Sequence, residues 1–165
     1  MQNKILSHQQ IQYKIERIAY QIYESNVDEK QLIIAGIDGG GLKFAKKLQG
    51  ILQKITQAEI VLCKVMMDKK DPLSSGVSTS VPEEEYANKA VVLVDDVLNS
   101  GTTLIYGVHH FLKTPLKRLK TAVLVNRNHK KYPVKADFKG ISLSTSLQEH
   151  IHVEFGKKEA LAYLQ

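Results

Sequence analysis

The sequence predicts an α/β fold in which helices cover both faces of a mostly parallel β-sheet. Segments with the apolar period of helices alternate along the 165 residues with short apolar runs typical of buried strands. Alternation of this kind is typical of βαβ units, which build parallel sheets. Because no internal repeat or linker divides the chain, we expect residues 1–165 to form a single domain.

The first half of the chain contains two helical and two strand patterns. Ser7 begins a Ser-x-x-Gln capping box, and a stripe of isoleucines predicts a helix over residues 10–25. Apolar runs predict strands at residues 32–37 and 60–66. Between these strands, apolar residues at helical spacing predict a helix over residues 42–55.

The second half continues the alternation after a polar interval. Residues 72–82 are rich in serine and lack an apolar period, which predicts a long flexible loop. Such loops often act as lids, although a plain connection is the alternative. A strand is then predicted at residues 91–94, a helix at 102–112 and a strand at 121–125.

The C-terminal segments are shorter than those of the main alternation. Residues 134–143 and 150–153 are strand-like, and we expect them to build a small cap. Residues 157–164 are predicted to close this cap as a helix.

The most informative stretch runs from residue 91 to residue 103. An apolar strand leads into Asp95 and Asp96, and a small-residue loop opens the next helix. Open α/β sheets bind ligands at the carboxyl ends of their strands, so both features should line a site. Neighbouring side chains on an extended backbone point to opposite sides, so the two carboxylates should accept hydroxyl groups rather than share one proton.

The loop after the acidic pair has the composition of an anion site. It consists of Asn99, Ser100, Gly101, Thr102 and Thr103. Free N–H groups at a helix start attract phosphate, and Gly101 lets the backbone approach it closely. The Gly-Lys-Ser/Thr of an ATP-binding P-loop is missing. The alternative is an ordinary strand-to-helix turn with an N-cap.

Residues 91–103 resemble the phosphoribosyl-diphosphate (PRPP) signature of type I phosphoribosyltransferases. That signature is a hydrophobic strand, two acidic residues, two apolar residues and a small-residue loop with Gly-x-Thr. Nearly the whole chain resembles the branch of bifunctional pyrimidine operon attenuation regulators/uracil phosphoribosyltransferases, most clearly in residues 10–25, 124–129 and 133–146. The resemblance implies a type I phosphoribosyltransferase-like parallel sheet flanked by helices, with a small cap, or hood, from the C-terminal segments.

The resemblance also implies roles for the site residues. Asp95 and Asp96 would be the catalytic pair that binds the ribose hydroxyls, and residues 99–103 would hold the 5-phosphate. The pyrophosphate loop after the first strand corresponds here to Asp38, Gly39, Gly40 and Gly41. The implied cofactor is Mg²⁺, held mainly by the substrate rather than by a protein metal site.

Several positions depart from the family pattern. The regulator branch has Lys-Thr-Arg-Gly at the pyrophosphate loop, so this chain loses two cations and gains a carboxylate. Three glycines still let backbone N–H groups face a ligand, and a flexible turn is the alternative. In the flexible loop, Lys69 stands roughly where the family has an arginine, and it can neutralise pyrophosphate without a bidentate fork.

The acceptor end also departs from the pattern. Asn99 stands where purine-specific relatives carry an aspartate that acts as general base, which favours a pyrimidine acceptor. Asn126 replaces an aspartate of the family, and we expect Asn126 and Arg127 on the nucleobase side.

Charge and composition suggest partners and compartment. The net charge is +6, and one stretch is strongly basic: Lys113, Lys117, Arg118, Lys120, Arg127, Lys130, Lys131, Lys135 and Lys139. This stretch is either a solvated face or a surface that contacts RNA phosphates. The single Cys63 and the lack of a long apolar run predict a cytoplasmic protein without a membrane span. The resemblance implies a homodimer.

Two functions are consistent with these observations. The first is transfer of 5-phosphoribosyl from PRPP to a nucleobase, with uracil favoured, and release of pyrophosphate. The alternative is a nucleotide-sensing, RNA-binding regulator of pyrimidine genes with little or no catalysis, which the altered pyrophosphate loop favours.

Overall fold

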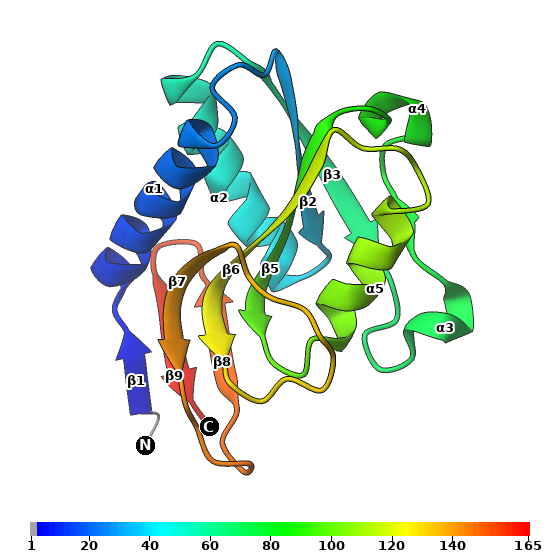
Figure 1. The fold of residues 1–165 in the computed structure, drawn as a ribbon. Coiled ribbons are helices and arrows are strands. Elements are labelled where there is room, and N and C mark those ends of the chain that lie inside the picture. The colour runs from blue at the N-terminus through cyan, green and yellow to red at the C-terminus, as the bar shows by residue number, and fades with distance from the viewer. Residues whose placement is uncertain (1–2) are drawn as a thin grey trace.

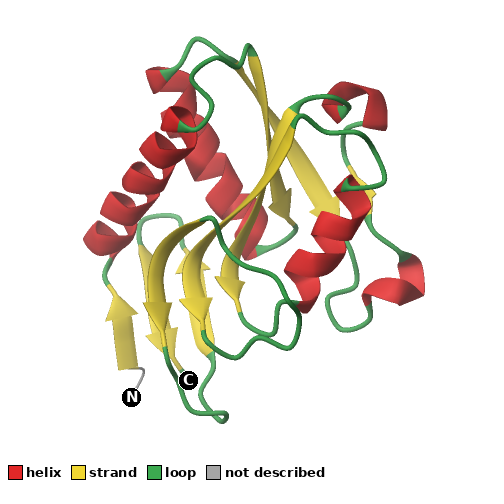
Figure 2. Cartoon of the chain, viewed as in Figure 1, coloured by secondary structure: helices red, strands yellow, loops and turns green. Residues whose placement is uncertain are grey.

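A mostly parallel sheet forms the centre of the protein in a computed structural model, which describes residues 3–165 (Figures 1 and 2). Its strand order is β4-β3-β2-β5-β6-β7, and only β4 runs antiparallel to its neighbour. The strands are β2 (Gln31–Ile37), β3 (Glu59–Met66), β4 (Ser78–Thr79), β5 (Ala90–Leu98), β6 (Arg118–Arg127) and β7 (Phe138–Leu143).

Helices lie on both faces of this sheet, as the sequence predicts (Figure 1). One face carries the two long helices, and the other carries α5 with the shorter ones. The helices are α1 (His8–Glu24), α2 (Gly40–Ile55), α3 (Pro72–Ser75), α4 (Glu83–Tyr86) and α5 (Thr102–Phe111). The predicted capping box at Ser7 is present, with Gln10 as its partner. No helix in residues 3–165 is long and apolar enough to cross a bilayer.

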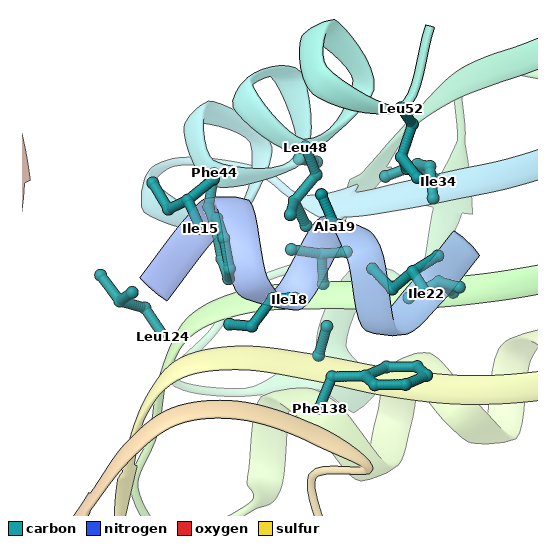
Figure 3. Packing of buried hydrophobic residues seen from close by; sticks show 14 of the residues in the cluster. Ile15, Ile18, Ala19, Ile22, Ile34, Phe44, Leu48, Leu52, Leu124 and Phe138 are labelled. Atoms are coloured by element: carbon teal, nitrogen blue, oxygen red, sulfur yellow. The ribbon is translucent and has the colours of Figure 1, made fainter. Parts of the chain in front are cut away.

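Two hydrophobic clusters pack against the sheet, one on each face. On the first face, the isoleucines of α1 pack toward Phe44 and Leu48 of α2 and toward the sheet (Figure 3). On the second face, Phe111 of α5 packs edge-on against Tyr86 of α4. The sheet is covered on both sides, which explains why β2 and β5 are almost entirely apolar. Cys63 is buried in the second cluster, as predicted.

A small antiparallel sheet forms the predicted cap. Its order is β1-β9-β8, with β1 (Asn3–Leu6), β8 (Ile151–Phe155) and β9 (Ala160–Leu164). The helix predicted at residues 157–164 is wrong, because β9 pairs with β8 on one side and with the N-terminal β1 on the other. The cap assignment of residues 134–143 is also wrong, since β7 extends the main sheet parallel to β6.

Two further predictions need correction. Residues 72–82 contain α3 and β4 rather than an unstructured loop, because β4 finds a partner in β3. The strand predicted at residues 91–94 continues to Leu98, because pairing with β6 extends through Asp95 as far as Leu98. The acidic pair therefore lies within β5, near its carboxyl end.

Candidate functional site

The acidic pair lies between two hollows at the carboxyl end of the main sheet. Asp95 is 6% exposed and lines one hollow together with residues 97–104. Asp96 is half-buried and lines the other hollow together with Gly39, Gly40 and Lys43. Successive residues of a strand face opposite sides, which explains the division. Each carboxylate also accepts the backbone N–H of the next residue, at 2.9 Å for Asp95 and 2.8 Å for Asp96.

The electrostatics of Asp95 connect the pair to the flexible loop. Burial raises the pKa of Asp95 well above its ordinary value, and the charge of Asp96 raises this pKa further. The ammonium of Lys69 lowers the same pKa. The carboxylates therefore line separate hollows, as strand alternation predicts, but they still interact. A cationic ligand group or a hydroxyl donor beside Asp95 would favour its ionised form.

The loop after the pair encloses the first hollow. Gly101 has left-handed backbone angles, φ 88° and ψ 0°, and α5 begins at the next residue. The hydroxyls of Ser100 and Thr102 lie 2.9 Å apart, so the predicted loop residues are brought together. A Cβ at Gly101 would lie 2.6 Å from Cγ1 of Val134, so glycine is required for space as well as for φ.

The glycine loop lies directly against the acidic pair. A Cβ at Gly40 would lie 2.0 Å from Oδ2 of Asp96, and a Cβ at Gly41 would lie 2.8 Å from the carbonyl oxygen of Val94. Gly39 has φ 96° and precedes the first residue of α2. The sequence suggested glycines that expose backbone N–H groups. The structure adds a steric reason, because two of these glycines allow α2 to begin in contact with β5.

Lysines from other elements surround the glycine loop. Nζ of Lys69 lies 3.4 Å from the position that a Cβ at Gly39 would take. Nζ of Lys64, on β3, lies 3.7 Å from Oδ1 of Asp38. Lys43 of α2 lines the hollow that contains Asp96. Residue type and spacing alone do not single out Lys43 or Lys64. The signal for Lys64 is the strand register, since it is the partner of Gly36 in the β2–β3 pairing, and the signal for Lys43 is its place in the first turn of α2.

The two residues predicted on the nucleobase side both donate hydrogen bonds to other residues of the protein. Asn126 is the register partner of Leu98 at the end of β5, and its Oδ1 is buried without a hydrogen-bond partner. Arg127 is 6% exposed and donates from Nε to the Thr145 hydroxyl (2.5 Å) and from Nη2 to the Ser146 carbonyl (2.8 Å). Arg127 therefore fixes the segment that leads to the cap, and it lines neither hollow beside the acidic pair.

A larger hollow lies elsewhere, between α1 and α2, with a volume of about 810 Å³. It is open and contains none of the predicted site residues. The two smaller hollows beside the acidic pair are chemically richer, because they combine carboxylates, lysines and the first residues of two helices.

Known proteins are similar to this chain in sequence and in fold. The model of the phosphoribosyl transferase domain matches residues 1–160. The bifunctional protein PyrR of Streptococcus pneumoniae (strain CGSP14) is 33% identical over 144 residues, which cover 85% of this chain and 82% of that protein.

Solved structures support the fold. A hypoxanthine phosphoribosyltransferase of Trypanosoma cruzi, complexed with the product IMP, has a TM-score of 0.76 at 16% identity and covers 98% of this chain and 91% of its own. A hypoxanthine-guanine phosphoribosyltransferase of Bacillus anthracis has a TM-score of 0.71 at 21% identity, covering 86% and 82%. The match over residues 1–160 and the identity to PyrR show that the chain belongs to the phosphoribosyl transferase family.

Proposed function

We propose that the protein transfers the 5-phosphoribosyl group of PRPP to a nucleobase, with uracil as the acceptor. The observation that carries this proposal is the position of the acidic pair between two hollows. The hollow with Asp95 has the start of α5 as an anion site, and the hollow with Asp96 has the start of α2 and Lys43. A ribose between the two carboxylates would place its 5-phosphate in one hollow and its diphosphate in the other.

In this reaction the bond from the anomeric carbon to the diphosphate oxygen breaks, and a bond to the base nitrogen forms. The electron pair leaves with pyrophosphate, and the proton of the base nitrogen passes to the departing pyrophosphate or to water. Asp95 and Asp96 bind the ribose hydroxyls and stabilise the positive charge that develops on the sugar. The loop of residues 99–103 holds the 5-phosphate, and Lys69 with the glycine loop neutralises the diphosphate.

Mg²⁺ fits this site as a substrate-bound ion. Asp96 is half-buried beside the open hollow, and carboxylate oxygens are suitable Mg²⁺ donors. Within residues 3–165, no three or more His, Cys, Asp or Glu side chains are arranged to hold a metal ion. Most ligands would therefore come from PRPP and water, and the ion would offset the diphosphate charge when bound.

The acceptor end supports a pyrimidine. Asn99 carries an amide, which cannot take the proton that an aspartate would accept from a purine. Arg127 acts on this end through Thr145 and Ser146, which it binds. Asn126 lies beside the end of β5, where its Nδ2 donates to the Ser142 hydroxyl at 3.2 Å. PyrR, the relative described above, is named as bifunctional, so transfer to uracil is also compatible with a second role.

Pyrophosphate release in the presence of PRPP, Mg²⁺ and each nucleobase in turn tests the proposal. We expect release with uracil and no release after Asp95→Asn combined with Asp96→Asn. Asp28→Asn is a matched control, because Asp28 is an exposed carboxylate outside both hollows. Wild-type rates in the double variant would contradict the assignment of the pair.

We propose RNA binding as a second function, supported by five lysines of the basic stretch. Arg127 is buried, and Lys117, Arg118 and Lys135 lie within 4.0 Å of carboxylates. In the described chain no carboxylate lies that close to the other five: Lys113, Lys120, Lys130, Lys131 and Lys139.

The test is a titration of pyrimidine-leader RNA, with and without nucleotide, at several salt concentrations. RNA binding should weaken steeply with salt, since phosphate contacts release counterions. Binding that is absent or insensitive to salt counts against this function.

We also propose a homodimer, which light scattering during gel filtration would measure.

A further inference from the structure

A carboxylate borders the hollow where the diphosphate would bind, because Asp38 directly precedes Gly39, which lines that hollow. Oδ1 of Asp38 accepts the backbone N–H of Gly39 at 3.0 Å, and the same oxygen lies 3.7 Å from Nζ of Lys64. The Asp38 side chain is 53% exposed, so it does not owe its position to burial. One backbone donor of the glycine loop and one adjacent cation are therefore already bound to an anion that belongs to the protein.

An incoming diphosphate would compete with this internal anion. Its oxygens need N–H donors and cations, and Asp38 both engages these groups and repels negative charge. Lys69 and Lys43 remain beside the glycine loop as cations for the diphosphate, while Asp96 and Glu154 are carboxylates in the lining of the same hollow. The expected result is weakened binding of a diphosphate rather than its exclusion.

The 5-phosphate would not meet this competition. The hollow formed by residues 97–104 shares no residue with the hollow beside Gly39 and Gly40, and the acidic pair lies between them. A ligand with only a 5-phosphate would use the first hollow and leave the pair Asp38–Lys64 intact. The two phosphate ends of PRPP are thus affected unequally by Asp38.

We infer that Asp38 is a specificity-determining residue, an internal anion that makes the pocket favour a nucleoside monophosphate over PRPP. Lys64 is the cation that a diphosphate must take from Asp38. This inference rests on the proposed function, because it assigns selectivity to the same pocket. The altered glycine loop would then lower the affinity for PRPP and leave the affinity for a nucleoside monophosphate unchanged.

Calorimetric titration with PRPP and with uridine 5′-monophosphate, each with Mg²⁺, tests the inference on the full chain. Asp38→Asn keeps the shape and the acceptor oxygen but removes the charge. Removing a unit charge about 4 Å from a phosphate should tighten PRPP binding by at least about fivefold. The affinity for the monophosphate should stay unchanged.

Lys64→Gln completes a double-mutant cycle. In the wild-type background this change should weaken PRPP binding, because it leaves the Asp38 carboxylate without its cation and so increases its repulsion of the diphosphate. In the Asp38→Asn background it should weaken PRPP binding, because the lysine is then free for the diphosphate. Asp28→Asn and Lys30→Gln are the charge-matched controls, and both residues are exposed and lie outside the two hollows.

The outcomes separate the inference from the proposed function. If wild-type protein binds both ligands and Asp38→Asn leaves PRPP binding unchanged, the inference is overturned and the proposed function stands. Weaker PRPP binding in that variant overturns it as well, because the carboxylate would then help to bind the substrate, for example through Mg²⁺. If wild-type protein binds neither ligand, the proposed function itself fails.

Discussion

Gly41 is a position where one added carbon should cost measurable stability. It is the second residue of α2, and its substituent would point at the middle of the main sheet. A Cβ there would lie 2.8 Å from the Val94 carbonyl oxygen, 2.9 Å from Oδ1 of Asp95 and 3.1 Å from the Asp95 Cα. Two of these three atoms belong to the backbone of β5, which is bonded on both sides by β2 and β6. These two backbone atoms therefore cannot move away from an added Cβ without disturbing the sheet.

The magnitude follows from two opposing contributions. Overpacking a well-packed core costs about 1–3 kcal/mol. Replacing glycine by alanine in a helix gains up to about 1 kcal/mol. Gly41→Ala should therefore destabilise the protein by about 1–2 kcal/mol. For a chain of this length, that corresponds to a fall in Tm of roughly 2–8 °C.

Gly50→Ala is the matched control in the same helix. Gly50 is exposed, and a Cβ there would meet nothing within 4 Å. It should therefore show the helix gain alone, about 0.5–1 kcal/mol of added stability. Urea unfolding followed by circular dichroism gives both values. If Gly41→Ala is as stable as Gly50→Ala, the close contact between α2 and β5 is refuted as a constraint on this residue.

Three other predictions concern groups buried near the site or in the core. Since the folded-state pKa of Asp95 lies above its ordinary 3.8, the unfolded chain ionises first as pH rises, so stability falls from about pH 4 up to the folded pKa. Asp95→Asn should remove this loss and raise Tm at pH 7, and an unchanged Tm would argue against it. Burial raises the pKa of the Cys63 thiol, so iodoacetamide should alkylate Cys63 slowly in native protein and rapidly in urea. Arg127→Met removes charged donors from Thr145 and Ser146; it should cost about 2 kcal/mol and speed amide exchange in residues 144–149.

The central strands and long helices of the main sheet could be predicted from sequence because each has a local pattern, whereas the strand order could not. Each buried strand is a continuous apolar run, and each long helix has an apolar stripe and, for α1, a capping box. The cap could not be predicted as well. Residues 160–164 become a strand because β1, more than 150 residues earlier, supplies one of its partners. Such a partner leaves no mark on local periodicity, so the local pattern predicts a helix where the structure has a strand.

The site likewise contains residues that a continuous stretch of sequence predicts and residues that only the fold brings to it. Loop 99–103 and the acidic pair come from one continuous stretch, so residue type and spacing suffice to find them. Lys43 and Lys64 reach the glycine loop only through the α2 start and the β2–β3 register. The family resemblance puts Arg127 on the nucleobase side, and only the structure shows that its donors bind residues 145 and 146.

The glycine loop and the acidic pair constrain each other. This constraint bears on the cationic side chains that the loop lacks relative to the regulator branch. At Gly40 a Cβ would lie 2.0 Å from Oδ2 of Asp96, so this carboxylate now occupies space that any larger residue would need. An arginine at Gly40 would require the Asp96 side chain to adopt another conformation. The lost cation is therefore not a single missing charge. It is coupled to the conformation of Asp96, and two other cationic groups lie close by, Lys69 beside Gly39 and Lys43 in the hollow with Asp96.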